Sequence, residues 1–326
     1  MDVSVIMINY NTFDLTRDAL ESIFTHTEGI EYEIILIDNA SPDGSGEKLR
    51  DLFGERIVYI QAGANLGTSK AFNIGLKQSK GKYILWLNTD ILMKENFIKK
   101  LFDYMESDPK CGICGGNILD FNGKPAGSFR NDFLNVNTFK RLYSFTWHLL
   151  SLIPHKRNDY NYTNKVKEVA WIGGVDMFVR REIFLQVGGF DEVIFMYSEE
   201  LEFQYRVKEL TSYTIKSVPW ATLYHLGGAS TKGKVKRFNP KWEKMMLMGF
   251  PRYLYKWFGE KEVKKYLKVR YRGAKKQYFL AQITNNKIKM ERYKGQQKIF
   301  LECLSDFDNY IKLLNAGSND IFQVEE

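Results

Sequence analysis

VSVIMINYNTFDLTRDALESIFTHTEGIEYEIILIDNASPDGS, residues 3–45, contains two short apolar runs separated by a stretch with helical periodicity. The runs at 3–8 and 33–37 are rich in Val and Ile, which favour β-strands. Thr12 or Asp14 is a suitable N-cap for a helix over about 14–26.

The same alternation continues to residue 87. It predicts helices at 45–53 and 68–79 and strands at 57–60 and 83–87. Near-continuous apolar strands separated by helices are typical of a parallel sheet that is covered on both faces. We therefore predict an α/β fold of the doubly wound, Rossmann-like kind.

Polar residues follow each of the four predicted strands. Ligands of such sheets bind at the carboxyl ends of the strands, so these residues are expected to line a binding site. They are Asn9-Tyr10-Asn11, Asp38-Asn39, Gly63-Ala64-Asn65 and Asn88-Thr89-Asp90. No GxGxxG follows the first strand and no GxxxxGK[ST] occurs, so a glycine-rich phosphate loop is not expected. A divalent metal is then the natural partner of a bound diphosphate.

The chain beyond residue 100 gives a weaker signal. Residues 112–119 and 213–218 predict strands, and 121–137 predict a loop. The aromatic stretch 138–153 predicts a helix, which either packs in a core or forms a flap at the acceptor or lipid side. Acids and glycine pairs concentrate in 169–210. They are Gly173-Gly174, Gly188-Gly189, Asp176, Asp191, Glu192, Glu199, Glu200 and Glu202.

Charge is distributed unevenly along the 326 residues. Residues 232–326 hold 22 Lys/Arg and 10 Asp/Glu, a net charge of +12, whereas residues 1–231 carry a net charge of −4. We predict a catalytic domain at 1–231 and a basic, mainly helical region at 232–326. The asymmetry favours an anionic partner. No helix-turn-helix, zinc-finger or RNA-binding motif is present, which disfavours nucleic acid.

Three cysteines argue against a disulfide scaffold. Cys111 and Cys114 form a CxxC, but no second Cys/His pair stands at a spacing that would complete a zinc site. We interpret both as structural residues of a buried strand.

The order and spacing of the motifs resemble the family-2 glycosyltransferases of GT-A fold, especially bacterial rhamnosyltransferase-like enzymes of surface-polysaccharide and cell-wall assembly. The resemblance runs from residue 3 to about 231. Its motifs are VSVIMINYN, IDNASPDGS, NLGTSKAFNIGL, LNTD, GGVDMFVRREIFLQVGGFDE, SEELEFQYR and YHLGGAST. It implies a metal-dependent, inverting hexosyltransferase with a dTDP- or UDP-linked sugar donor and a glycan or lipid-linked acceptor.

The resemblance also implies roles for particular residues. Asp90 and His225 would bind Mn²⁺ or Mg²⁺, and Glu200 would be the general base, with Glu199 and Asp191 as alternatives. Trp171 is either core or acceptor-stacking, beside Gly173 and Gly174. The donor-binding residues would be Asn9, Tyr10, Asn11, Asp38, Asn65, Gly67, Asn73, Asn88, Thr89 and Asp90.

Two residues depart from the family pattern. Asn88 occupies the position of the first acid of the metal-binding DxD motif, so Asp90 is the expected ligand and Asn88 is expected to contact the sugar or metal-bound water. Glu200 replaces the usual Asp of the general base. Each acid also has a structural interpretation: Asp90 as a helix cap, Asp191 as a turn cap, Glu202 as part of a solvated helix face. His225 would then be a packed core histidine.

Three alternatives to a transferase remain at this stage: a nucleotide-sugar-binding protein, a nucleotidyltransferase and a nucleic-acid-binding protein. The nucleotidyltransferase lacks the glycine-rich basic signature expected near the first strand. The nucleic-acid interpretation is disfavoured for the reason given above.

The basic region at 232–326 also predicts where in the cell the protein acts. Phe250, Tyr253, Leu254, Trp257 and Phe258 recur at helical spacing beside Arg252, Lys256 and Lys261. This pattern suits a helix lying on an anionic membrane surface, or aromatic residues packing on the catalytic domain. The sequence has no signal-peptide pattern and no run of ~18 apolar residues, so we expect a cytoplasmic protein, peripheral at the inner face of the membrane.

Overall fold

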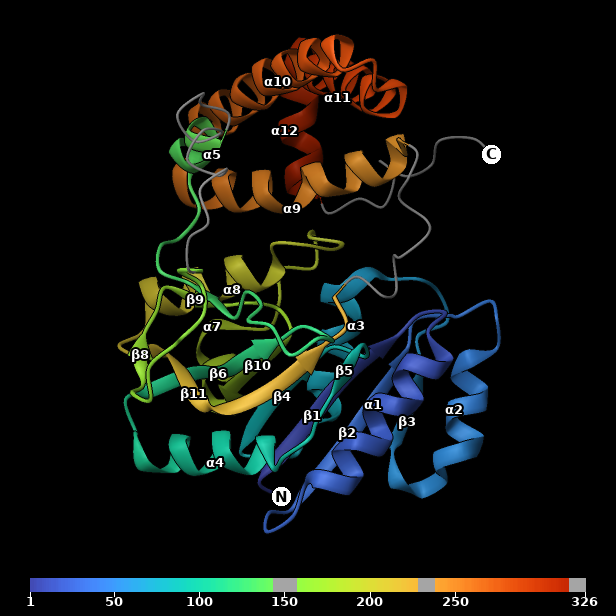
Figure 1. Cartoon of the computed structure of the whole chain (residues 1–326), viewed down its shortest axis with the longest axis vertical. Helices are drawn as coiled ribbons and strands as arrows, with labels where there is room; N and C mark the ends of the chain where they lie inside the picture. The colour runs from blue at the N-terminus through green and yellow to red at the C-terminus, as the bar shows by residue number, and fades with distance from the viewer. Residues whose placement is uncertain (143–156, 228–237, 317–326) are drawn as a thin grey trace. The chain divides into compact units, whose positions relative to one another are not determined.

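The computed structural model describes residues 1–142, 157–227 and 238–316 (Figure 1). These residues form two compact units. The α/β unit contains residues 1–133, 157–191 and 199–227, and the helical unit contains 134–142, 192–198 and 238–316.

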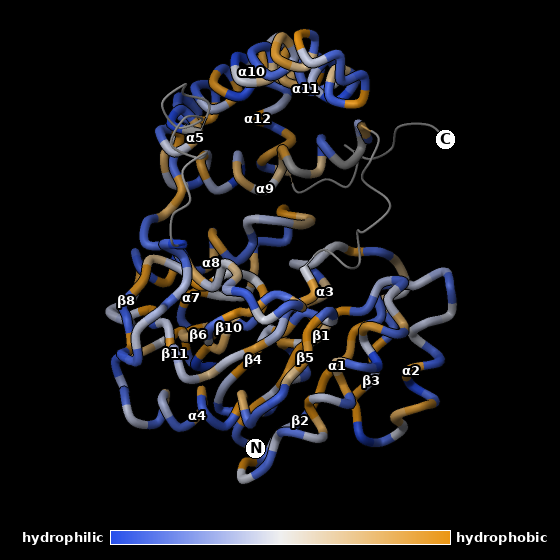
Figure 2. The backbone as a smooth tube through the Cα atoms, viewed as in Figure 1, coloured by the Kyte–Doolittle hydropathy of each residue, from blue (hydrophilic) through white to orange (hydrophobic). Residues whose placement is uncertain are grey.

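The first four long strands of the α/β unit are parallel neighbours in the order β3-β2-β1-β4. They are β1 (Val3–Asn9), β2 (Tyr32–Asp38), β3 (Val58–Gln61) and β4 (Tyr83–Leu87). Their apolar runs are coloured orange in the core of Figure 2. The parallel half of the sheet is therefore confirmed, with each predicted strand displaced by no more than one residue at either end.

Beyond β4 the sheet is mixed rather than parallel. The order continues β4-β10-β6-β11-β5, and β10 (Asp176–Arg180) runs antiparallel to both β4 and β6 (Cys111–Leu119). The twelve-residue β11 (Thr214–His225) lies parallel to β6 and antiparallel to the short β5 (Ile91–Leu92) and β8 (Lys167–Glu168). A separate pair is formed by β7 (Phe129–Arg130) and β9 (Trp171–Ile172). Cys111 and Cys114 are buried and free in β6, as predicted.

Helices cover both faces of the sheet, as predicted. One face packs against α1 (Phe13–His26), α2 (Ser45–Phe53) and α4 (Phe97–Ser107) through fully buried residues such as Leu20, Leu49 and Leu101. The other face packs against α3 (Gly67–Gln78), α7 (Arg181–Val187) and α8 (Glu199–Leu210). Each fully buried large apolar side chain stabilises the fold by about 1.5–3 kcal/mol, so these two cores fix the strand ends.

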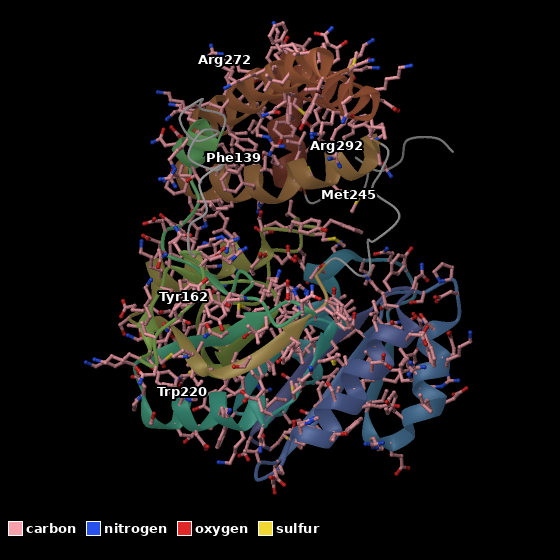
Figure 3. The ribbon with its side chains drawn as sticks, in the orientation of Figure 1. Phe139, Tyr162, Trp220, Met245, Arg272 and Arg292 are labelled. Atoms are coloured by element: carbon pink, nitrogen blue, oxygen red, sulfur yellow. The ribbon has the colours of Figure 1, made fainter. Side chains whose placement is uncertain are left out.

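The helical unit has its own aromatic core. Its helices are α5 (Val136–Leu142), α9 (Pro240–Phe258), α10 (Glu260–Ile283), α11 (Lys287–Ser305) and α12 (Phe307–Ala316). Phe139 of α5, labelled in Figure 3, packs against Phe250 and Tyr266, with ring centroids 4.9 and 5.1 Å apart. In the described part of the predicted 138–153 helix, Phe139 thus contributes to a core while Lys140 and Arg141 are exposed, and residues 143–153 lie outside the described residues.

The prediction of a membrane-facing aromatic helix at 250–258 is wrong for three of its five aromatic and apolar residues. Phe250 is 5% exposed, Tyr253 0% and Leu254 1%. They pack inside the helical unit, where Phe250 contacts Tyr266 and Tyr253. An amphipathic pattern is the same whether the apolar side meets lipid or other helices, which is why the sequence could not separate the two. No described helix combines the length and apolar character needed to span a bilayer.

Candidate functional site

Buried side chains fasten the carboxyl end of β1 to that of β2. Asn9 Nδ2 donates to Asp38 Oδ1 (2.8 Å) and to the hydroxyls of Ser41 and Ser45, while Asn9 Oδ1 accepts from Thr12 and Thr16. Asp38 also accepts from the backbone N–H and hydroxyl of Ser41 and from Gln61 Nε2. We call this group the strand-end network; its members are Asn9, Thr12, Thr16, Asp38, Ser41 and Ser45.

The network leaves few polar atoms free for a ligand. Every hydrogen-bonding position of the Asn9 amide is used inside the protein. The Asp38 carboxylate is fully buried, and of its donors only Gln61 has an exposed side chain. Tyr10, 42% exposed, and Asn11, in the left-handed region at φ +56°, stand next to the network.

The remaining predicted donor residues of the parallel half connect loops. Asn65 Oδ1 accepts from Asn39 Nδ2 (3.1 Å) and from the backbone N–H of Gly67 (3.2 Å), at the start of α3. Asn73 of α3 clips the backbone of Phe190 with both ends of its amide, at 3.0 and 2.9 Å. Gly189 is required beside this clip because a Cβ there would collide with the Asn73 amide. Asn73 thus holds the loop that leads to Asp191, which is half-buried.

Asp90 and His225 are 135 residues apart in sequence and meet in the fold. His225, the last residue of β11, pairs with Ile91 of β5, and the backbone N–H of Leu226 donates to the Asp90 carbonyl. This pairing brings His225 Nε2 to 3.0 Å from Asp90 Oδ1. Both side chains are largely buried, at 19% and 9% exposure. The predicted helix-cap interpretation of Asp90 does not apply, since Asp90 lies between β4 and β5.

The 3.0 Å contact is a hydrogen bond between the two side chains. A carboxylate and an imidazole that meet in this way would be able to hold a divalent cation between them and a bound ligand. No cluster of three His, Cys, Asp or Glu ligands occurs within the described ranges. A cation held here would therefore depend on oxygens from a bound diphosphate, which is the usual arrangement for Mg²⁺. Thr89 is buried next to Asp90, and Asn88 donates its backbone N–H to Val175.

A second group of acids gathers where β10 and α8 begin. Glu199 and Glu200 stand in the first turn of α8, where the helix dipole favours negative charge. The two preceding residues, Tyr197 (φ +68°) and Ser198 (φ +77°), are both left-handed, an unusual backbone for side-chain-bearing residues. Glu200 lies beside Gly174, where an added Cβ would stand 3.4 Å from its Cδ. The Val175 backbone that binds Asn88 is adjacent to Gly174, so Glu200 and the Asp90 loop are neighbours.

Glu199 differs from Glu200 in its surroundings. Glu199 is 4% exposed, and its Oε2 has no hydrogen-bond partner among the described residues. Burial, followed by the charge of Glu200, raises the pKa of Glu199 well above its usual value. A raised pKa disfavours the ionised carboxylate, which is the form that a general base requires.

Asp176 is a site residue that the sequence assigned no role. It is fully buried at the start of β10, where Oδ2 accepts from the backbone N–H of Gly116 (2.6 Å), while Oδ1 has no partner in the described part of the chain. Burial raises its pKa to about 7, and nearby His225 lowers it in part. The only sequence signal was an acid interrupting the apolar run VDMFV. We use the name acid cluster for Asp176 at the start of β10 together with Glu199 and Glu200 at the start of α8, without implying that Asp176 contacts the two glutamates.

The predicted acceptor-side residues adjoin this cluster. Trp171 is buried at 7%, yet its Nε1–H has no acceptor among the described residues, and the guanidinium of Arg130 lies 5.7 Å from its ring. Gly173 donates its backbone N–H to Ser128. Trp171 therefore lies in the core, while its indole N–H has no acceptor among the described residues.

Buried polar contacts hold α8 in place. Gln204 makes two 2.8 Å hydrogen bonds with the backbone of Ile172. Glu202 is fully buried and pairs with Arg206 at 2.7 Å, which in turn donates to the carbonyl oxygens of Val187 and Gly189. The interpretation of Glu202 as part of a solvated helix face is wrong, because Arg206, one turn later, is also buried and neutralises its charge.

Comparison with known proteins identifies relatives of the α/β unit. The sequence model described as "Glycosyl transferase family 2" matches residues 4–167, half of the chain. The low-salt glycan biosynthesis hexosyltransferase Agl10 of Haloferax volcanii is 27% identical over 211 residues, which cover 64% of this chain and 62% of Agl10. The putative teichuronic acid biosynthesis glycosyltransferase TuaG of Bacillus subtilis is 28% identical over 39% of this chain and 51% of its own.

A solved structure has a similar fold. The crystal structure of GalNAc-T7 with UDP, GalNAc and Mn²⁺ matches with a TM-score of 0.57 and 18% identity, over 95% of this chain and 57% of that one. The chain thus spans less than two thirds of these relatives. The match confirms the predicted GT-A arrangement of the sheet with an added helical region.

Proposed function

Because this chain belongs to glycosyl transferase family 2, we propose that it transfers a sugar from a nucleoside-diphosphate donor to an acceptor hydroxyl with inversion at the anomeric carbon. The observation that carries the proposal is the meeting of Asp90 and His225 at 3.0 Å. Asn88, two residues before Asp90, donates its backbone N–H to Val175, and the adjacent Gly174 lies beside Glu200. These contacts support a cation-binding pair and an acid suited to an acceptor hydroxyl in one part of the α/β unit.

The donor site would lie at the carboxyl ends of the parallel strands. Tyr10, Asn11 and Asn65 are at that edge, and Asp38 is within reach of a nucleoside that replaces Gln61. Asn88 would contact the sugar or a metal-bound water. Asp90 and His225 would hold Mn²⁺ or Mg²⁺, which supplies Lewis-acid stabilisation of the departing diphosphate when bound.

Glu200 would act on the acceptor. An acceptor hydroxyl oxygen forms the new bond to the anomeric carbon as the bond to the diphosphate oxygen breaks, and the hydroxyl proton passes to the Glu200 carboxylate. Attack from the face opposite the leaving group gives a single displacement and inversion. Glu199, the buried neighbour of Glu200 in the first turn of α8, would stand beside this carboxylate without titrating in its place.

The finer assignments remain proposals. UDP is favoured over dTDP by the ligand of GalNAc-T7, and a hexose by the name of Agl10, although a rhamnosyl donor fits the sequence resemblance equally. Agl10 and TuaG are named for glycan and teichuronic acid biosynthesis, which favours a glycan or lipid-linked acceptor in surface-polysaccharide assembly. The basic helical unit favours an anionic membrane surface as a further partner.

A screen of nucleotide sugars by thermal shift, with and without Mn²⁺, tests the proposal. The true donor should raise the melting temperature by mass action, more so with the cation. With that donor, release of nucleoside diphosphate should require the acceptor. A shift with a nucleotide sugar but no transfer to any acceptor would instead indicate a nucleotide-sugar-binding protein.

A further inference from the structure

The hairpin of α10 and α11 carries charges of only one sign around its turn. Residues 263–290 contain nine Lys/Arg and no Asp/Glu. Within α10, Lys261, Lys265, Lys268 and Arg272 follow one another at spacings of four, three and four residues, which places them on one face of the helix. The opposite face, with Val263, Tyr266 and Leu267, is buried in the helical unit. We call the four cations the basic stripe.

The basic stripe borders a groove. Lys140 of α5 and Lys264 join the four stripe residues and Val269 around a volume of about 360 Å³. Lys265 pairs with Glu262 at 2.7 Å, whereas Lys261, Lys268 and Arg272 make no ion pair within the described ranges. Like charges four residues apart destabilise a helix, so a stripe of this kind is relieved by an anionic partner. The exposed side of Arg272 is seen in Figure 3.

Exposed apolar residues lie at the end of the same hairpin. Phe279 is 61% exposed, Ile283 66% and Ile288 56%. Phe279 and Ile283 follow Arg272 by seven and eleven residues, so they continue the face that bears the basic stripe. A tight turn joins the two helices here, closed by the Asn286 backbone N–H donating to Ala281 (2.9 Å). We call Phe279, Ile283 and Ile288 the apolar tip.

We propose that this hairpin docks the protein on an anionic lipid bilayer, with the apolar tip entering the headgroup region and the basic stripe contacting lipid phosphates. Cations and large apolar residues on one exposed face are what an interfacial helix needs. A nucleic acid or an anionic glycan would use the cations but gain little from exposed isoleucines. The proposal deepens the membrane partner proposed above and moves it from α9, whose apolar residues are in the core, to α10 and α11.

Co-sedimentation of the full chain with vesicles tests the proposal. Vesicles of phosphatidylcholine alone are compared with vesicles that also contain phosphatidylglycerol, over a series of salt concentrations. The wild type should bind the anionic vesicles and dissociate as salt rises. Replacing the basic stripe by glutamine should weaken binding about fivefold per removed cation, since each contributes about 1 kcal/mol.

The apolar tip separates a bilayer from other polyanions. The triple variant Phe279→Ser, Ile283→Ser, Ile288→Ser should bind anionic vesicles at least about tenfold less well. The matched control is Leu301→Ser with Lys298→Gln, two exposed positions of α11, which should bind like wild type. All positions are exposed, and circular dichroism checks that each variant folds. Wild-type binding by the triple variant, or equal binding to neutral vesicles, would overturn the proposal.

A competitor and an activity readout complete the test. Displacement from vesicles by soluble polyphosphate, with binding that depends on the stripe but not on the tip, would assign a polyanion site instead. Donor-induced thermal shifts should be unchanged in every variant. If the wild type itself shows no donor-induced thermal shift, this result contradicts the proposed function. It does not contradict the docking surface, which vesicle binding tests separately.

Discussion

The strand-end network and the acid cluster are both buried polar groups at the same sheet, yet their hydrogen bonding differs. In the strand-end network, Asn9 and Asp38 use their polar atoms on one another, on Ser41 and on Ser45. In the acid cluster, Asp176 Oδ1 and Glu199 Oε2 are buried without a partner among the described residues. Since an unpaired buried polar atom costs free energy, satisfied groups suit a scaffold and unsatisfied ones suit a site.

The two groups also differ in how their carboxyl groups are bonded. Asp38 accepts four hydrogen bonds, whereas Asp176 uses one oxygen on Gly116 and leaves the other without a partner among the described residues. Burial raises the pKa of Asp176 to about 7 and that of Glu199 well above its usual value. Substitutions in the strand-end network should therefore affect stability first, whereas those in the acid cluster should affect turnover or the pH dependence of stability.

The largest effect is expected at Glu200. Glu200→Gln keeps size and hydrogen bonding but removes the proton acceptor, so turnover should fall by ~10²–10⁴ while donor affinity is retained. The matched control is Glu209→Gln, an exposed acid of the same helix. Steady-state kinetics and donor thermal shifts measure both quantities. If Glu200→Gln is near wild type while Asp191→Asn or Glu199→Gln is inactive, the role of base passes to that residue.

The next effect concerns the Asp90–His225 pair. Chelation with EDTA should stop turnover, and Mn²⁺ or Mg²⁺ should restore it. Asp90→Ala should lose about 10²–10³-fold in kcat/KM, since a bound cation is worth several kcal/mol to the transition state. Isothermal titration of Mn²⁺ in the presence of nucleoside diphosphate checks the same site without activity. Full activity in chelator would show that other groups neutralise the diphosphate.

Asp176 should destabilise the native protein at high pH. Its pKa of about 7 lies above the usual 3.8, so the native state holds the proton more tightly than the unfolded chain. Stability should fall as pH rises from about 4 to 7, by at most about 4 kcal/mol. Asp176→Asn keeps an acceptor for Gly116 and should remove this dependence. Urea unfolding at pH 5 and pH 8 measures it, and equal pH dependence in both proteins would contradict the assignment.

The smallest of these effects is expected in the strand-end network. Asp38→Ala removes the acceptor of the Ser41 N–H and one of the acceptors of the Asn9 amide, so the unfolding free energy should fall by about 1–3 kcal/mol. The donor KM should rise as well. Thermal melting and donor titration separate the two effects. If the melting temperature is unchanged while the donor KM rises, Asp38 contacts the donor directly and its hydrogen bonds in the strand-end network do not stabilise the fold.

The sequence predicted the parallel strands and their helices to within a residue, because short β-branched apolar runs alternate there with segments of helical periodicity and are bounded by polar turns. It could not predict that Asn73 clips Phe190, which stands 117 residues away, or that Arg206 turns inward to Glu202. Those contacts depend on the tertiary structure. A polar residue in a loop has the same sequence signal whether its side chain binds a ligand or the protein backbone. The meeting of Asp90 with His225 was expected only from the family resemblance, since nothing local links them.

The loop 192–198 has a consequence for how the gene can vary. This loop belongs to the helical unit, where Tyr197 packs so closely on Gly249 of α9 that a Cβ at 249 would collide with its carbonyl oxygen. Yet the loop leads directly into Glu199 and Glu200. The chain enters the helical unit after residue 133, and again for 192–198, before the last helices begin. Recombination that exchanged the chain after residue 231 would therefore separate Gly249 from the 192–198 loop on which it packs. We expect the segments before and after residue 231 to be inherited together rather than exchanged as independent modules.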